Sequence, residues 1–162
     1  NIKEQECLHV SDIRDMVQRL TINGISVEAI PIEEVRCAYE RIEPDLNTIR
    51  KKSYSDWIPA DIYLSLRNAR STLYMFYKED LYVGFIVCSI STDKSGELTL
   101  FVWASYQKPE YNYLNAIFKF LEKVADDMKA VAIEFDSNRK GWEKIAPLHD
   151  FNLVTQTYRR EL

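Results

Sequence analysis

Residues with reactive or metal-binding side chains are scattered along this chain rather than grouped at a known catalytic spacing. His9 and His149 are its two histidines, and neither has the nearby second ligand that a metal site requires. Cys88 lies in the middle of an apolar run, which favours a small core residue over a nucleophile. With Cys7 and Cys37 it makes three cysteines without a Cys-x-x-Cys pair, which indicates neither a disulfide framework nor a zinc site. We expect no bound metal and a reducing, cytoplasmic compartment.

One short segment, residues 107–112, stands where an anion would be expected to bind. It reads Gln-Lys-Pro-Glu-Tyr-Asn and connects a predicted strand to the longest predicted helix. The N-terminus of a helix attracts phosphate, because its first N–H groups have no partner within the helix. A phosphate-binding loop usually contains glycine at such a point, since a backbone without Cβ atoms can approach closely. This segment contains no glycine.

Length and composition describe one ordinary soluble domain spanning residues 1–162. The chain is 46% hydrophobic, which is enough for one continuous core. Its 28% charged residues and net charge of −4 give no basic excess that would attract nucleic acid. No apolar run approaches the roughly 18 to 20 residues that span a bilayer, so no membrane association is expected.

The first 70 residues are predicted to be mainly helical, because apolar residues recur three and four apart between proline and glycine breaks. Helices are predicted over residues 11–20, from Pro31 to Glu43-Pro44, and from Pro59 onward. Asn23-Gly24 ends the first of them. The polar residues 45–56 are interpreted as a loop or a short helix.

From residue 71 onward the pattern changes to that of a sheet with covering helices. Strands are predicted over residues 73–77, 81–92, 97–105, 130–135 and 151–158. A long helix is predicted after Pro109 and a short one over residues 139–148. In the third strand, alternation places Leu98, Leu100, Val102 and Ala104 on one face and Thr99, Phe101, Trp103 and Ser105 on the other. Both faces are apolar, which indicates that both are covered.

This order of elements resembles the GCN5-related N-acetyltransferase (GNAT) superfamily over most of the chain. Residues 137–144, Ser-Asn-Arg-Lys-Gly-Trp-Glu-Lys, and the later Asp150-Phe151 pair resemble a group of short phage-encoded GNAT-like proteins. Those proteins often show an Arg-x-Gly-Trp element before a Gly-Phe pair, and here Asp150 replaces the glycine. Residues 57–63 are similar to the upstream part of the same group. The resemblance implies an α/β (α+β) fold with a mixed, mostly antiparallel sheet flanked by helices.

The resemblance also implies a binding mode for acetyl-CoA. In the family, the third strand of the meander separates from the next strand and pairs with the pantetheine arm, and the pyrophosphate rests on the start of the long helix. The corresponding cofactor-binding residues would be Trp103, Ala104, Ser105, Tyr106, Gln107 and Lys108, with Arg139 at the cationic rim. The basic residues around Trp142 have a second interpretation, as the solvated start of a helix.

Several family features are altered here. The family loop reads Gln/Arg-x-x-Gly-x-Gly/Ala, whereas Glu110 and Asn112 take the places of its glycines. A carboxylate facing a pyrophosphate weakens binding, on the order of 1 kcal/mol. Pro109 would remove an N–H from the first turn of the helix. Lys108 would offset part of the loss.

The catalytic groups are less clearly indicated than the cofactor site. The family tyrosine that protonates the thiolate would fall near Ala146, so Tyr158 and Tyr106 are possible substitutes. Glu97, Glu134 and His149 are candidate general bases, and the spacing selects none of them.

Two functions are compatible with these residues. The first is an acetyl-CoA-dependent N-acetyltransferase with a degenerate cofactor loop, whose partners would be an acyl-CoA and an amine acceptor. The second is a non-catalytic GNAT-fold protein of a phage, either a virion component or a factor that binds a host protein.

Overall fold

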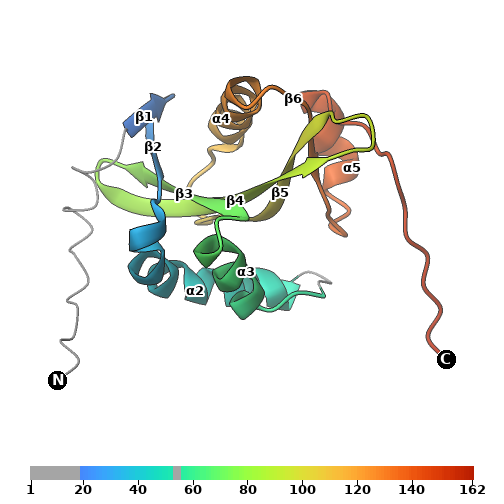
Figure 1. Cartoon of the computed structure of the whole chain (residues 1–162), viewed down its shortest axis with the longest axis horizontal. Coiled ribbons are helices and arrows are strands. Elements are labelled where there is room, and N and C mark those ends of the chain that lie inside the picture. Colours follow the sequence, from blue (N-terminus) through green and yellow to red (C-terminus); the bar gives the residue numbers. More distant parts are fainter. Residues whose placement is uncertain (1–18, 53–55) are drawn as a thin grey trace.

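The computed structural model describes residues 19–52 and 56–162, which form one six-stranded sheet with helices on both faces (Figure 1). The strand order is β1-β2-β3-β4-β5-β6, and every neighbouring pair is antiparallel except β5 and β6, which are parallel. The strands are β1 (Arg19–Ile22), β2 (Ile25–Ala29), β3 (Ser71–Lys78), β4 (Leu81–Thr92), β5 (Leu98–Gln107) and β6 (Ala130–Phe135). The helices are α2 (Val35–Lys52), α3 (Pro59–Arg67), α4 (Leu114–Asp127) and α5 (Trp142–Ile145), with 3-10 turns η1 (Ile32–Glu34) and η2 (Ala146–His149). The predicted fold class is confirmed.

The N-terminal part contains a hairpin that the sequence analysis did not predict. β1 and β2 pair around the Asn23-Gly24 turn, where both residues have positive φ, 50° and 78°. Two consecutive positive φ values form the tight turn that best matches the twist of paired strands. Residues 19 and 20, predicted to end a helix, therefore lie in β1. The rest of the helix predicted over residues 11–20 lies outside the described residues.

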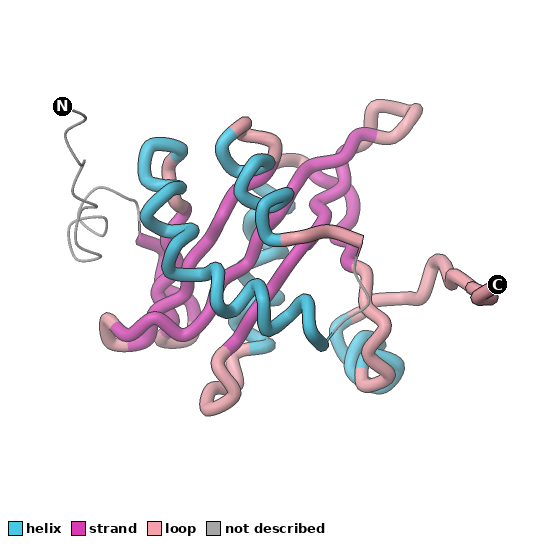
Figure 2. The backbone as a smooth tube through the Cα atoms, turned by 90° about the horizontal axis from the view of Figure 1, so that it is seen from below, coloured by secondary structure: helices cyan, strands magenta, loops and turns pink. Residues whose placement is uncertain are grey.

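Helix α2 continues through Pro44, so the predicted end of the helix at Glu43-Pro44 is wrong. A proline inside a helix costs about 3 kcal/mol, because it removes one N–H and crowds the preceding turn. Ile42 and Leu46, on either side of Pro44, are both 0% exposed. Fully burying an isoleucine or a leucine contributes about 1.5–3 kcal/mol each, which offsets that cost. The helix thereby becomes long enough to lie across several strands (Figure 2).

Helix α3 begins at Pro59, as predicted. The backbone N–H of Ile58 donates to Asp61 Oδ2 at 2.8 Å, and Pro59 has no N–H that would need a partner. Ile62 and Leu66 face the sheet and are almost completely buried.

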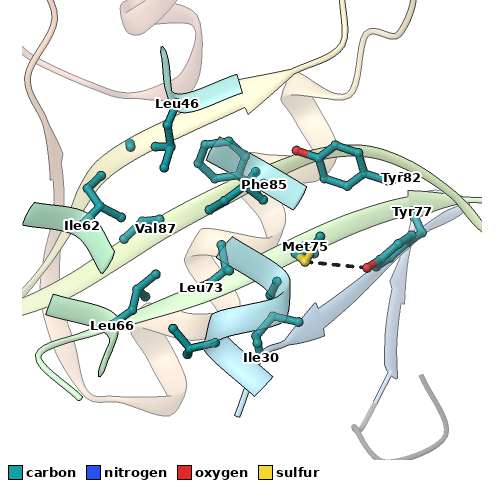
Figure 3. Close-up of a cluster of buried hydrophobic side chains, with 14 residues drawn as sticks. Ile30, Leu46, Ile62, Leu66, Leu73, Met75, Tyr77, Tyr82, Phe85 and Val87 are labelled. Carbon is teal, nitrogen blue, oxygen red and sulfur yellow. Dashed lines mark hydrogen bonds between the residues drawn. The ribbon is translucent and has the colours of Figure 1, made fainter. Parts of the chain in front are cut away.

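The sheet separates two apolar cores. The first joins α2 and α3 to one face of the strands, and Figure 3 shows it with Leu46, Ile62, Leu66, Leu73, Phe85 and Val87 in contact. In the same core the Tyr77 hydroxyl donates to Met75 Sδ at 3.7 Å. The second joins α4 to the other face and includes Val83, Ile86, Leu100, Phe118, Leu121 and Val124. Both faces of the sheet are therefore covered, as the apolar content of both faces predicted.

A one-residue bulge in β5 reverses the direction of its side chains. Val87 pairs with Ala104 and Cys88 pairs with Val102, so Trp103 is an extra residue in β5. Val102 belongs to the core under α4, whereas Ala104 belongs to the core under α2 and α3. The predicted alternation, which placed Ala104 on the same face as Val102, is wrong beyond the bulge. A bulge also increases the local twist of its strand.

The C-terminal end lacks the predicted strand over residues 151–158. The helix predicted over residues 139–148 is two short pieces, α5 and η2, and Asp150 follows them in the left-handed region with φ 61°. Glycine is favoured at such a φ, and this chain has an aspartate there. Phe151 packs against Phe118 and Phe135, with ring centroids 5.1 and 5.2 Å apart. Beyond it the chain is exposed and runs away from the sheet (Figure 1).

Three further findings concern the expectations drawn from composition. Cys37 in α2 is disulfide-bonded, although the sequence indicated no disulfide, and Cys88 is free and buried. Across residues 19–52 and 56–162, no helix is both long and apolar enough to cross a membrane. In the same ranges, no three His, Cys, Asp or Glu side chains are grouped so that they could hold a metal ion.

Candidate functional site

Strands β5 and β6 separate part of the way along their length. They pair from Leu98 with Ala130 to Val102 with Phe135, where β6 ends, whereas β5 continues to Gln107. Beyond that last pair, residues 104–107 pair with β4 on one side, and residues 103–107 pair with no described strand on the other. We call this opening the fork. The edge of β5 that faces the fork presents backbone amide groups that require hydrogen-bond partners.

The far end of the fork is held against β4 by a close backbone approach. A Cβ atom on Gly84 would lie 2.3 Å from the carbonyl oxygen of Tyr106, so only glycine fits opposite this part of β5. One residue beyond the strand, the N–H of Lys108 donates to the carbonyl oxygen of Val83 at 2.9 Å. Pairing with β4 thus fixes β5 through the whole length of the fork.

A turn connects the fork to α4. The N–H of Tyr111 donates to the carbonyl oxygen of Lys108 at 3.1 Å, and the side-chain amide of Gln107 donates to the carbonyl oxygen of Tyr111. Helix α4 then begins at Leu114, later than predicted, so Pro109 is not in its first turn and removes no N–H from it. Tyr113 occupies the N-cap position and makes no side-chain capping hydrogen bond. The first N–H groups of α4 have no acceptor within the helix and make this end attractive to an anion.

Two stacked tyrosines flank the start of α4. The rings of Tyr111 and Tyr113 are 5.3 Å apart at an interplanar angle of 19°, and Lys78 Nζ lies 5.8 Å from the centroid of the Tyr111 ring. The Tyr113 hydroxyl is buried and has no hydrogen-bond partner among the described residues. Burial raises the pKa of Tyr113 above its usual value, so the hydroxyl stays protonated at neutral pH. A buried hydroxyl without a partner is rare in folded proteins and therefore marks a place where a ligand could supply one.

A polar cluster lies on the opposite face of the fork, beneath α2. The Tyr82 hydroxyl donates to Asp45 Oδ2 at 2.8 Å, and Lys108 Nζ lies 5.5 Å from the centroid of the Tyr82 ring. Arg41 lies over the same ring at 5.1 Å. Tyr106 stacks on Phe85 at 6.3 Å. Burial and the Asp45 carboxylate raise the pKa of Tyr82, and burial followed by the Asp45 charge raises that of Tyr106.

The structure brings together one part of the predicted site. Trp103, Ala104, Ser105, Tyr106, Gln107 and Lys108 follow one another along the fork and its turn. Glu134 is exposed in β6, beside Phe101 and one residue before the last pair of the two strands. Ile133 and Phe135 pack toward α4, so alternation directs Glu134 to the face that α2 and α3 cover. Arg139 is exposed in the loop that follows β6, with its N–H donating to Ser137 Oγ at 3.2 Å.

The other predicted catalytic residues lie elsewhere. Glu97 is exposed in the hairpin before β5, at the opposite end of that strand from Gln107. Tyr158 is 89% exposed in the C-terminal segment, and its hydroxyl donates to Gln156 Oε1 at 2.7 Å. His149 packs on Phe118 of α4, 4.4 Å between ring centroids. An open hollow lined by Tyr74, Cys88, Leu100 and Met128 lies near the C-terminal end of α4, away from the fork.

Comparison with solved structures identifies the fold. No family model and no curated protein sequence matches the chain. A ribosomal-protein-alanine N-acetyltransferase from Brucella melitensis biovar Abortus is similar in structure, with a TM-score of 0.62, 10% identity and coverage of 85% of this chain and 99% of that one. This chain has the GNAT fold. An aminoglycoside acetyltransferase from an uncultured soil metagenome gives a TM-score of 0.62 at 9% identity, covering 86% and 98% of the two chains.

A third GNAT-fold neighbour is an acetyltransferase from Trypanosoma brucei, with a TM-score of 0.57 at 15% identity and coverage of 85% of this chain and 99% of that chain. These identities are low, so the likeness concerns the fold, and fold alone does not establish an activity. The resemblance to phage-encoded GNAT-like proteins stays a prediction.

Proposed function

We propose that this chain is an N-acetyltransferase-like protein that binds acetyl-CoA at the fork and transfers the acetyl group to an amine. One observation carries the proposal: β5 extends past its last pair with β6 and leads, through one turn, to the start of α4, which has no side-chain cap. An extended amide chain can pair with a strand edge as a further strand would. An anion can then bind at the start of the helix.

The fit of the cofactor is better for its arm than for its phosphates. The backbone of residues 103–107 offers amide groups to the pantetheine arm. At the start of α4, backbone N–H groups favour phosphate, whereas the exposed carboxylate of Glu110 opposes it. The ammonium group of Lys108 lies near the Tyr82 ring, on the face beneath α2. We therefore expect the phosphates to be held mainly by backbone groups and the affinity to be modest.

The side chains at the fork can handle the protons of an acetyl transfer. Acetyl-CoA would supply an activated acetyl thioester. Glu134, exposed beside the fork, is the acid best placed to accept a proton from an amine. Tyr106 can donate a proton to the departing sulfur, because its raised pKa keeps the hydroxyl protonated at neutral pH. Among the three predicted catalytic acids and bases Glu97, Glu134 and Tyr158, only Glu134 lies beside the fork.

Calorimetric titration with acetyl-CoA tests the proposal. We expect acetyl-CoA to bind with a dissociation constant in the micromolar to millimolar range. Acetyl-pantetheine, which lacks the nucleotide, should bind with a comparable affinity, because the site for the pantetheine arm is better formed than the site for the phosphates. Glu134→Gln should retain binding and lose transfer to a panel of amines. The absence of binding at millimolar acetyl-CoA would contradict the proposal.

A further inference from the structure

The hollow near the C-terminal end of α4 has a volume of about 500 Å³ and lies away from the fork. Side chains from three neighbouring strands form its floor: Thr72 and Tyr74 of β3, Cys88 and Ile90 of β4, and Leu100 of β5. The register places them on the face that α4 covers, because Thr72 pairs with Cys88 and Ile90 pairs with Leu100. Small-molecule sites in proteins have volumes of about 300–1,000 Å³, so the hollow is large enough for a ligand.

The floor is open because two covering elements stop short of this part of the sheet. Helix α4 ends at Asp127, and its C-cap residue Met128 forms part of the rim and is 41% exposed. Strand β2 ends at Ala29, which pairs with Tyr74, so the pairing of β2 with β3 does not reach Thr72. The floor between these two ends is therefore accessible to a ligand.

Arg70 is placed at the rim by the turn that ends α3. The N–H of Arg70 donates to the carbonyl oxygen of Ser65 at 2.9 Å. The N–H of Ala69 donates to the carbonyl oxygen of Leu66 at 3.2 Å, and Ala69 is in the left-handed region with φ 55°. These two bonds form a Schellman turn, which commonly ends a helix. The turn sets Arg70 directly before β3, where it lines the hollow.

The guanidinium group of Arg70 is available to a ligand. Among the described residues that line the hollow, Arg70 alone has a charged side chain, and it makes no ion pair with residues 19–52 or 56–162. Asp127, at the end of α4, is already paired with Lys123 Nζ at 3.4 Å. A guanidinium group can bind a carboxylate through two parallel hydrogen bonds, which selects this group by both charge and shape.

The floor is suited to an apolar body rather than to a covalent reaction. Burial raises the pKa of Cys88 to about 12, so at neutral pH this side chain is a thiol and not a nucleophilic thiolate. Ile90 and Leu100 add aliphatic surface, and the half-buried ring of Tyr74 lies edge-on to Phe120 of α4, 4.8 Å between centroids. Ligand sites usually combine such an apolar lining with a few polar groups that fix the orientation of the ligand.

We propose that this hollow binds a small organic carboxylate whose body is a single ring or a short branched chain. The carboxylate contacts Arg70 at the rim, and the body lies on the floor formed by β3, β4 and β5. The site is separate from the fork and does not depend on the proposed acetyl transfer.

Titration of the isotope-labelled full chain with phenylacetate, followed by two-dimensional NMR, tests the proposal. We expect the largest shifts at the amides of Arg70 and of the floor residues, with a dissociation constant on the order of 1 mM for a ligand of this size. Phenylacetamide lacks the charge and acetate lacks the ring, so each should bind roughly tenfold more weakly or worse.

Two variants separate the role of the charge from that of the floor. Arg70→Gln should weaken phenylacetate binding roughly tenfold and leave phenylacetamide binding unchanged. Arg67→Gln is the matched control, because Arg67 is also exposed near the end of α3 but does not line the hollow. Thr72→Trp should fill the floor and abolish binding of both compounds.

Circular dichroism shows whether each variant keeps the fold, and the exposed Arg70 provides the decisive variant if Thr72→Trp does not fold. The proposal would be overturned if phenylacetate at about 20 mM shifted no amide of the hollow, or shifted amides at the fork alone. Equal binding of phenylacetate and phenylacetamide, or equal binding of phenylacetate by Arg70→Gln and the unchanged chain, would also overturn it.

Discussion

The carbonyl oxygen of Tyr106 in β5 lies where a side chain on Gly84 in β4 would have to begin, 2.3 Å from the Cβ position. Even an alanine would force the two strands apart at the fork. Gly84→Ala should therefore lower the free energy of unfolding by about 1–3 kcal/mol, the usual cost of overpacking. Urea unfolding followed by circular dichroism measures this loss.

A second glycine provides the control for Gly84. Gly141 has an ordinary negative φ, and a Cβ there would meet nothing within 4 Å. Gly141→Ala should change the free energy of unfolding by less than about 0.5 kcal/mol. Equal losses in the two variants would show that the Tyr106 carbonyl is not the cause.

The exposed carboxylate of Glu110 should weaken cofactor binding at the start of α4. Glu110→Lys replaces a repulsive charge with an attractive one, so we expect the affinity for acetyl-CoA to rise roughly two- to tenfold at low salt, with a smaller gain at high salt. Calorimetry at two salt concentrations measures the effect. Glu122→Lys, an equal charge change at an exposed position farther along α4, should have little effect. An unchanged affinity in Glu110→Lys would place the phosphates elsewhere.

Removing the Tyr113 hydroxyl, which has no hydrogen-bond partner among the described residues, should affect stability and cofactor binding differently. Removing a buried hydroxyl that lacks a partner should not destabilise the protein, so Tyr113→Phe should leave the free energy of unfolding unchanged or raise it by up to about 1 kcal/mol. The same change should weaken acetyl-CoA binding if the cofactor supplies the missing partner. Tyr111→Phe, in the neighbouring stacked ring, is the matched control. Lower stability with unchanged affinity would show that the hydroxyl serves the fold alone.

The buried side chains of Cys88 and Tyr74 make stability depend on alkaline pH. Burial raises the pKa of Cys88 to about 12, and burial followed by the Cys88 charge raises that of Tyr74 to about 12. In the unfolded chain these groups lose their protons near pH 9 and 10, so the unfolded state binds fewer protons as the pH rises. The contribution of these two groups to stability should therefore be constant below about pH 8 and fall between about pH 9 and 12.

Urea unfolding at several pH values measures this fall, which should reach about 1.4 kcal/mol at pH 10 from Cys88. Cys88→Ala should be less stable throughout, because it leaves a cavity, but its stability should fall less steeply above pH 9. An unchanged slope in that variant would show that the thiol ionises as readily in the folded protein as in the unfolded one.

Strands whose residue pattern is contained in a short stretch of sequence were predicted correctly. The bounds of β4 and β6 agree with the strands predicted over residues 81–92 and 130–135, because both are β-rich runs between turn residues. The prediction that the helix ends at Pro44 was wrong because of contacts with residues far away in the sequence. The sheet beneath α2 buries Ile42 and Leu46, and this packing outweighs the local cost of the proline.

Some residues of the candidate site were predicted from the sequence and others were not. Residues 103–108 were predicted as a contiguous run because the order of elements resembles a known family, and the structure places them along one fork. Asp45 was not predicted, since its contact with Tyr82 joins residues 37 positions apart and neither belongs to a motif. The bulge at Trp103 was also not predicted, because nothing in its local sequence breaks the alternation.

That bulge has a consequence for how the chain tolerates length changes. Since Trp103 is one residue more than β4 can match, removing or adding a single residue between Val102 and Gln107 would exchange the buried and exposed sides of everything that follows in the strand. The hairpin at residues 93–97 has no such constraint, because it lies in solvent at the other end of β5. Insertions should accumulate in that hairpin, whereas the strand beyond Val102 should keep its length in every functional descendant of this chain.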